Sequence, residues 1–168
     1  MSPTGHKFTA AALGVALAAP LLAQGKAMES ALCLAGAMFG ARVPDWSEMA
    51  RWIDGKRYSL IPHRGPTHWP GTWLAGLILS IIFLPSPFKE PAVGFFAAAL
   101  LHLVMDVMTP SGIPLLHPFS KNKAFRVYKS GSFFAEAGLT VVCWVIALAS
   151  LPFTSAGLSM SNFPTFSP

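Results

Sequence analysis

Five apolar segments, separated by short polar loops, limit the folds open to this sequence of 168 residues. They cover residues 8–23, 30–41, 71–84, 92–108 and 133–151. Several are shorter than the about 20 residues that cross a bilayer comfortably. However, 53% of the chain is hydrophobic and only 11% is charged, whereas about a quarter of the residues in a typical soluble domain are charged. We therefore predict an all-α, polytopic membrane protein with about five short transmembrane or membrane-embedded helices.

The chain is predicted to form a single domain. Its length is that of one domain, and no internal repeat is apparent. We expect a membrane-embedded helical domain over residues 1–152 and a flexible, uncharged tail over residues 153–168, which is rich in Ser, Pro and Phe. The sequence contains no nucleotide-binding loop and no nucleic-acid-binding motif, so we expect no nucleic-acid partner. It does not fix the oligomeric state.

Positive charges lie on one side of the predicted membrane topology. If the N-terminus is cytoplasmic and all five segments cross, only Lys26 and Lys89 lie on the far side. The other ten basic residues are Lys7, Arg42, Arg51, Lys56, Arg57, Arg64, Lys121, Lys123, Arg126 and Lys129. This asymmetry predicts a cytoplasmic N-terminus. An alternative is that the first segment is a secretory signal peptide with a mediocre cleavage site at residues 21–24, whose removal would also remove His6.

Two potential metal ligands, His102 and Asp106, interrupt the fourth apolar segment. Because they are four residues apart, both side chains project from one face of a helix. An unpaired carboxylate in an apolar setting costs several kcal/mol, so it normally finds a cation, a hydrogen-bond donor or a metal. The simpler interpretation is a hydrogen-bonded pair without a metal. The sequence Thr-Pro-Ser-Gly at 109–112 is predicted to end this helix.

The other candidate ligands fall on the same membrane face in this topology. His6 precedes the first segment, and Asp45, His63 and His68 lie in the first basic loop. The loops predicted on the opposite side, residues 24–29 and 85–91, contain no histidine. Pro44 favours a turn that presents Asp45, and the two loop histidines flank a Gly-Pro turn that allows them to converge. We therefore expect one cluster at one end of the protein.

These motifs carry a resemblance to a known family. The sequences PDW at 44–46, HRGPTHW at 63–69, HLVMD at 102–106 and TPSGIPLLHPF at 109–119 resemble the membrane-bound metal-dependent hydrolases typified by YdjM, an inner-membrane protein. The resemblance spans about residues 6–136. It implies a location in the bacterial inner membrane and a helical core distantly similar in ligand pattern to zinc-dependent phospholipase C. Position by position, it implies metal ligation by His6, Asp45, His63, His68, His102 and Asp106.

The sequence departs from the family pattern at three positions. Ser47 stands where the family often has a second Asp, Gly5 replaces a Thr or Ser, and Trp69 replaces a Ser. One carboxylate fewer implies either fewer ions or a site completed by Glu136 or water. Glu136 is also explained as a first-turn helix residue favoured by the helix dipole, and His117 as a surface or packing residue.

The ligand types indicate the chemistry. Imidazole with carboxylate suits zinc first, and manganese or iron less selectively. We expect hydrolysis of an ester, a phosphoester by preference and lipid-derived among the candidates, at the cytoplasmic membrane surface. Asp45 or Asp106 would also orient the water, and Arg64 with the basic residues 121–129 would steer an anionic substrate or the headgroup of a membrane lipid.

Two other classes of protein fit the same residues. A small ion or metal transporter with a pathway lined by His and Asp would place polar groups near mid-membrane, accessible from both sides. A non-catalytic membrane adaptor would bind no metal. The position of the cluster along the helices and its metal content discriminate among these classes.

Overall fold

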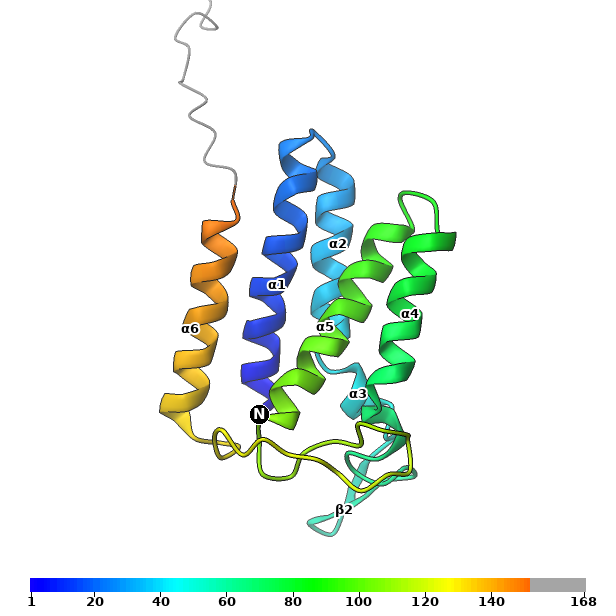
Figure 1. The fold of residues 1–168 in the computed structure, drawn as a ribbon, viewed down its shortest axis with the longest axis vertical. Helices are drawn as coiled ribbons and strands as arrows, with labels where there is room; N and C mark the ends of the chain where they lie inside the picture. Colours follow the sequence, from blue (N-terminus) through cyan, green and yellow to red (C-terminus); the bar gives the residue numbers. More distant parts are fainter. Residues whose placement is uncertain (152–168) are drawn as a thin grey trace, which may run out of the picture.

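Each of the five predicted apolar segments forms a helix in a computed structural model that describes residues 1–151. The five are α1 (Pro3–Ala23), α2 (Ala27–Gly40), α4 (Pro70–Phe83), α5 (Lys89–Val107) and α6 (Phe133–Ala149). They run roughly side by side and alternate in direction along the chain (Figure 1). The predicted all-α class is therefore confirmed. The tail predicted over residues 153–168 lies outside the described residues.

Short elements gather at the end of the bundle where the chain begins (Figure 1). They are helix α3 (Val43–Trp46), an antiparallel hairpin of β1 (Arg51–Ile53) and β2 (Lys56–Tyr58), and the 3₁₀ helix η1 (Pro66–His68). Within residues 1–151, strands occur only in this hairpin. Its Asp54-Gly55 turn has positive φ at both residues, 51° and 73°, as a two-residue turn with the twist of a hairpin requires.

Two helices are long and apolar enough to cross a membrane by length and composition. They are α1, with 21 residues and a mean hydropathy of 1.4, and α5, with 19 residues and a mean hydropathy of 1.5. Helices α2, α4 and α6 are apolar but shorter. The structure thus identifies two candidate membrane spans, and crossing by the other three helices stays a prediction.

Helices α2 and α5 approach each other closely through glycines. A Cβ atom on Gly36 or Gly40 would lie 2.0 or 2.1 Å from the carbonyl oxygen of Pro91 or Phe95, and one on Gly94 would lie 2.1 Å from that of Cys33. Small residues at a helix crossing are typical of membrane proteins, where close backbone contact replaces the hydrophobic drive. This contact packs α2 against the first half of α5, and the chain that follows α2 then passes beside the later turns of α5, where the Ala41 carbonyl accepts a hydrogen bond from His102.

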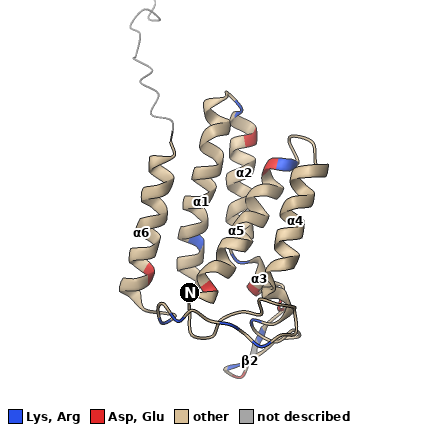
Figure 2. Cartoon of the chain, in the orientation of Figure 1, with Lys and Arg blue, Asp and Glu red and all other residues tan. Residues whose placement is uncertain are grey.

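Charged residues are concentrated at the same end of the bundle as α3 and the hairpin (Figure 2). That end comprises the first turns of α1, the loop of residues 41–69 and the loop of residues 108–132. The helices themselves carry few charges along their length (Figure 2). Any polar chemistry therefore belongs to this end, where the loops meet the helix termini.

Candidate metal centre

His6 lies inside helix α1, because that helix begins at Pro3 rather than at the apolar segment starting at residue 8. Ser2 caps the helix: its hydroxyl accepts a hydrogen bond from the Gly5 N–H at 3.1 Å. The Glu136 carboxylate, at the start of α6, accepts hydrogen bonds from the Ser2 N–H at 2.8 Å and from the Ser2 hydroxyl. The first turn of α1 is thus tied to α6, and His6 is held buried with 3% exposure.

His102 and Asp106 share one face of α5, as their spacing predicts, and both are buried. The Nδ1 atom of His102 donates a hydrogen bond to the Ala41 carbonyl at 2.8 Å. Since a carbonyl only accepts, the proton is on Nδ1 and the lone pair of the neutral ring is on Nε2. That Nε2 lies 3.5 Å from Asp106 Oδ2, which is too long for a hydrogen bond. The alternative of a simple hydrogen-bonded pair does not describe this contact.

His68 and Asp45 approach the same point from the loop. His68 Nε2 lies 3.5 Å from Asp45 Oδ1 and 3.6 Å from Asp106 Oδ2. On the other side, His6 Nε2 lies 3.4 Å from Asp106 Oδ1, and the His6 ring stacks on the His102 ring with centroids 3.7 Å apart. The structure therefore brings together five of the six predicted ligands at one end of the bundle.

These side chains fit a divalent metal ion. His68 Nε2 and His102 Nε2, the atoms that face the carboxylates, are buried and have no hydrogen-bond partner among the described residues. Such an atom costs about 1–3 kcal/mol when left unsatisfied. Nitrogen lone pairs that face carboxylate oxygens repel them unless a cation lies between. Ligands bonded at about 2.0–2.1 Å to a tetrahedral ion lie about 3.3–3.4 Å apart, close to the spacing of 3.4–3.6 Å that Asp106 keeps from the three rings.

Glu48 is a member of the site that the sequence prediction missed. It is fully buried, and its carboxylate lies 2.9 Å from His63 Nδ1 and 3.3 Å from His68 Nδ1. It also accepts a hydrogen bond from the Arg64 N–H at 2.9 Å. A carboxylate on Nδ1 sets the tautomer of a metal-binding imidazole and raises its basicity. Glu48 and the Thr67 hydroxyl, which lies 3.1 Å from the same Nδ1, therefore together orient His68 so that Nε2 faces the cluster.

Glu48 also offers a carboxylate next to Ser47, the position where the family often has a second Asp. The acidic side chain that is absent at residue 47 is thus present at residue 48. With Asp45 and His63, Glu48 forms a second group whose ligand atoms lie within 4.8 Å of one another. Glu136, the other residue considered for this role, instead accepts hydrogen bonds from Ser2 and from the Gly131 N–H. His63 is half-exposed and belongs to this outer group.

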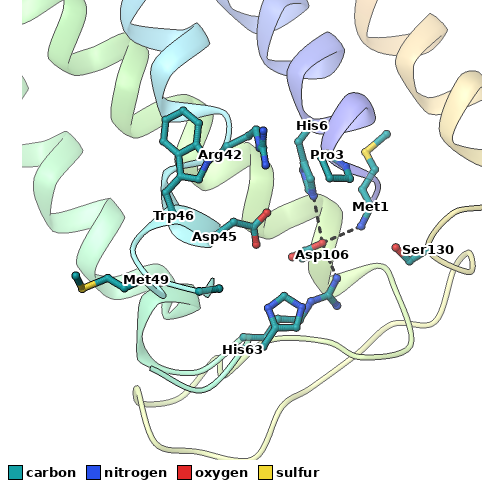
Figure 3. A pocket seen from close by; sticks show the side chains of 12 residues that line it. Met1, Pro3, His6, Arg42, Asp45, Trp46, Met49, His63, Asp106 and Ser130 are labelled. Carbon is teal, nitrogen blue, oxygen red and sulfur yellow. Dashed lines mark hydrogen bonds and ion pairs between the residues drawn. The ribbon is translucent and has the colours of Figure 1, made fainter. Parts of the chain in front are cut away.

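Arg64 is buried against the cluster rather than extended into solvent. Its guanidinium donates to Asp106 Oδ1 at 2.9 Å and to the Thr109 hydroxyl at 2.7 Å. The Met1 nitrogen lies 2.9 Å from the same Asp106 oxygen, and Figure 3 marks this contact together with that of His6. Cations thus surround Asp106.

His117 lies apart from the cluster: it is exposed, and its Nδ1 accepts a hydrogen bond from the Phe119 N–H.

The cluster borders a cavity of about 650 Å³. His6 and Asp106 line it from one side, and Arg42, Asp45 and Trp46 from the other (Figure 3). Burial raises the pKa of the Asp45 carboxyl, but its contacts with His68 and His102 outweigh burial and lower the pKa to about 2. Asp45 is therefore ionised at neutral pH, as a metal ligand has to be.

Together, the fold and this cluster define a small helical membrane protein with a His/Asp centre at one end of its bundle. The family model of the YdjM inner membrane protein matches residues 1–163, and the chain belongs to that family. This confirms the predicted resemblance to YdjM and supports a location in the inner membrane. No curated protein and no solved structure matches the chain.

We predict that Glu48→Gln weakens zinc binding about 10–100-fold, because His63 and His68 lose the charged carboxylate that orients them. The measurement is a competition titration of detergent-purified protein against a chromogenic chelator. Glu90→Gln, which changes the same residue type at the far end of α5, is the matched control and should bind zinc like the wild type. Equal zinc affinity of Glu48→Gln and wild type, with both folded by circular dichroism, contradicts the role assigned to Glu48.

Proposed function

We propose that this protein is a metal-dependent hydrolase that cleaves an ester, a phosphoester by preference, at the cytoplasmic face of the inner membrane. The observation that carries the proposal is the orientation of His68 and His102. Both rings turn a buried, unpartnered Nε2 toward the carboxylates of Asp45 and Asp106. The donor set of imidazole and carboxylate oxygen suits zinc first, with manganese or iron as less selective alternatives.

The residues that would hold the ion are His6, Asp45, His68, His102 and Asp106. A zinc ion with an open position, when bound, lowers the pKa of water to about 7 and so supplies hydroxide at neutral pH. The side chain of Asp45 is 24% exposed and faces the cavity, so it can accept a hydrogen bond from water and orient it. Asp106 is buried and held by Arg64, so its role is to bind the ion and fix the cluster.

The depth of the cluster favours a hydrolase over the alternative of an ion or metal transporter. In the part of the chain that the structure describes, the three groups that offer metal ligands all lie at one end of the bundle. A transport pathway would continue such groups toward the middle of the helices. A substrate that reaches the centre from the membrane surface is the simpler use of this arrangement, and a lipid-derived ester is among the candidates.

We also propose that all five long helices span the membrane, with the N-terminus and the metal centre on the cytoplasmic side. Three observations support this topology: the alternating helix directions (Figure 1), the collection of charges at one end (Figure 2) and the excess of basic residues there. Helices α2 and α4 have 14 residues each and are therefore about 21 Å long. Because the hydrocarbon core is about 30 Å thick, flanking residues or local thinning would complete these spans.

This topology predicts the labelling of single cysteines by a membrane-impermeant maleimide. In a background with Cys33 and Cys143 replaced by Ala, Ser130→Cys should be labelled only in inverted vesicles. Gln24→Cys should be labelled only in intact spheroplasts. Both parent residues are exposed, at opposite ends of the bundle. Labelling of both cysteines from the same side overturns the five-span topology.

The hydrolase proposal predicts hydrolysis of bis(p-nitrophenyl) phosphate by the zinc-loaded protein. A chelator should abolish the activity and added zinc should restore it. We expect His68→Ala to lower kcat/KM at least about 100-fold, because it removes an imidazole from the ion and leaves Glu48 without that partner. The matched control is His117→Ala, which removes an exposed histidine outside the cluster and should leave kcat/KM unchanged. Activity that persists without metal, or that falls equally in both variants, refutes the proposal.

A further inference from the structure

Arg42 lies in the wall of the cavity that holds the metal centre. It directly precedes α3, the helix that carries Asp45, and so it is placed by the same turn of chain. Its side chain lines the cavity together with those of His6, Asp45 and Asp106 (Figure 3). A group bound beside the metal centre would therefore meet Arg42.

The guanidinium of Arg42 is positioned but not neutralised by the protein. Its central carbon lies 5.5 Å from the centre of the Trp46 ring, within the range of a cation–π contact. Its Nε has no hydrogen-bond partner, and none of the ion pairs found among the described residues includes it. The Nε of Arg64 is unpartnered as well, but Thr109 and Asp106 already accept hydrogen bonds from its two Nη atoms. Of these two cavity arginines, Arg42 is the one available to a ligand.

An arginine whose guanidinium has no ion-pair partner and lies against an aromatic ring favours an anionic ligand. Its planar fork matches the two oxygens of a phosphate or carboxylate, to which it donates two parallel hydrogen bonds. Stacking on Trp46 restricts the guanidinium in advance, so less side-chain entropy is lost on binding. A neutral ester would offer this cation only a carbonyl oxygen. The same cavity contains the carboxylates of Asp45 and Asp106, which repel an anion unless cations offset them.

We propose that Arg42, stacked on Trp46, binds the phosphate group of the substrate beside the metal centre, and that the substrate class is accordingly phosphate esters rather than neutral esters. This inference rests on the proposed function, because only a hydrolase would make the bound phosphate compound a substrate. The binding of phosphate itself does not depend on turnover. The phosphate group belongs either to a soluble ester or to a lipid headgroup.

The test is isothermal titration of inorganic phosphate into detergent-purified protein, with and without zinc. We expect Arg42→Ala to weaken phosphate binding about 10–100-fold, and Arg42→Lys, which keeps the charge but loses the fork, to fall between it and the wild type. The matched control is Arg51→Ala, which removes an arginine from the exposed surface of β1 and should bind phosphate like the wild type. Zinc content, measured in parallel, should be equal in all four proteins.

Phosphate affinity that is unchanged in Arg42→Ala, or that falls equally in Arg51→Ala, overturns the inference. If phosphate binding depends on Arg42 but the protein shows no turnover, the phosphate site is supported and the proposed hydrolase function is contradicted. A failure of the phosphate site and a failure of the hydrolase function can therefore be told apart. Competition for phosphate in mixed micelles identifies the source of the group. Stronger competition by phosphatidic acid than by glycerol 3-phosphate assigns it to a lipid, and the reverse order assigns it to a soluble ester.

Discussion

The buried carboxylate of Asp106 is the constraint on which the rest of this structure depends. It lies in the last turns of an apolar helix, where an unpaired charge is costly. Each neighbouring element places a cation or an imidazole beside this carboxylate: His6 from α1, His68 from η1 and Arg64 from the loop between β2 and η1. The ends of elements far apart in the sequence are thereby drawn to one point. A divalent ion shared with His102 would stabilise the same carboxylate, and it would also satisfy the imidazole nitrogens that have no hydrogen-bond partner.

The surrounding shell positions these groups without taking part in the cluster. The Ala41 carbonyl fixes the tautomer of His102, and Glu48 together with the Thr67 hydroxyl orients His68 through its Nδ1. Glu136 holds the Ser2 cap, and through it the turn that carries His6. These contacts depend in turn on the glycine-mediated approach of α2 to α5, which brings Ala41 within reach of His102. The bundle is thus a scaffold that presents rigid ligands at its end.

The sequence predicted much of this arrangement for identifiable reasons. Long apolar runs leave helices as the simplest solution in a membrane, and a spacing of four residues places His102 and Asp106 on one helix face. In the predicted topology all candidate ligands fall on one membrane face, and this indicated that their side chains form one cluster. Two local signals were present but not used: Ser2-Pro3, which starts α1 before His6, and Asp54-Gly55, which turns the hairpin. Glu48 carried no such signal, because its burial arises only when the loop of residues 41–69 folds against α5. Likewise, the sequence alone does not distinguish Arg42 from Arg64, since the difference lies in which of them Asp106 engages.

The most direct test of the central claim, that the convergent imidazoles and carboxylates bind a metal, is zinc K-edge X-ray absorption spectroscopy of the zinc-reconstituted protein. We expect tightly retained zinc with a first shell of nitrogen and oxygen at about 2.0–2.1 Å, outer-shell scattering from imidazole and no sulfur at about 2.3 Å. A first shell containing sulfur would place the ion at a cysteine instead. Folded protein that retains no zinc after reconstitution would contradict metal binding by this cluster.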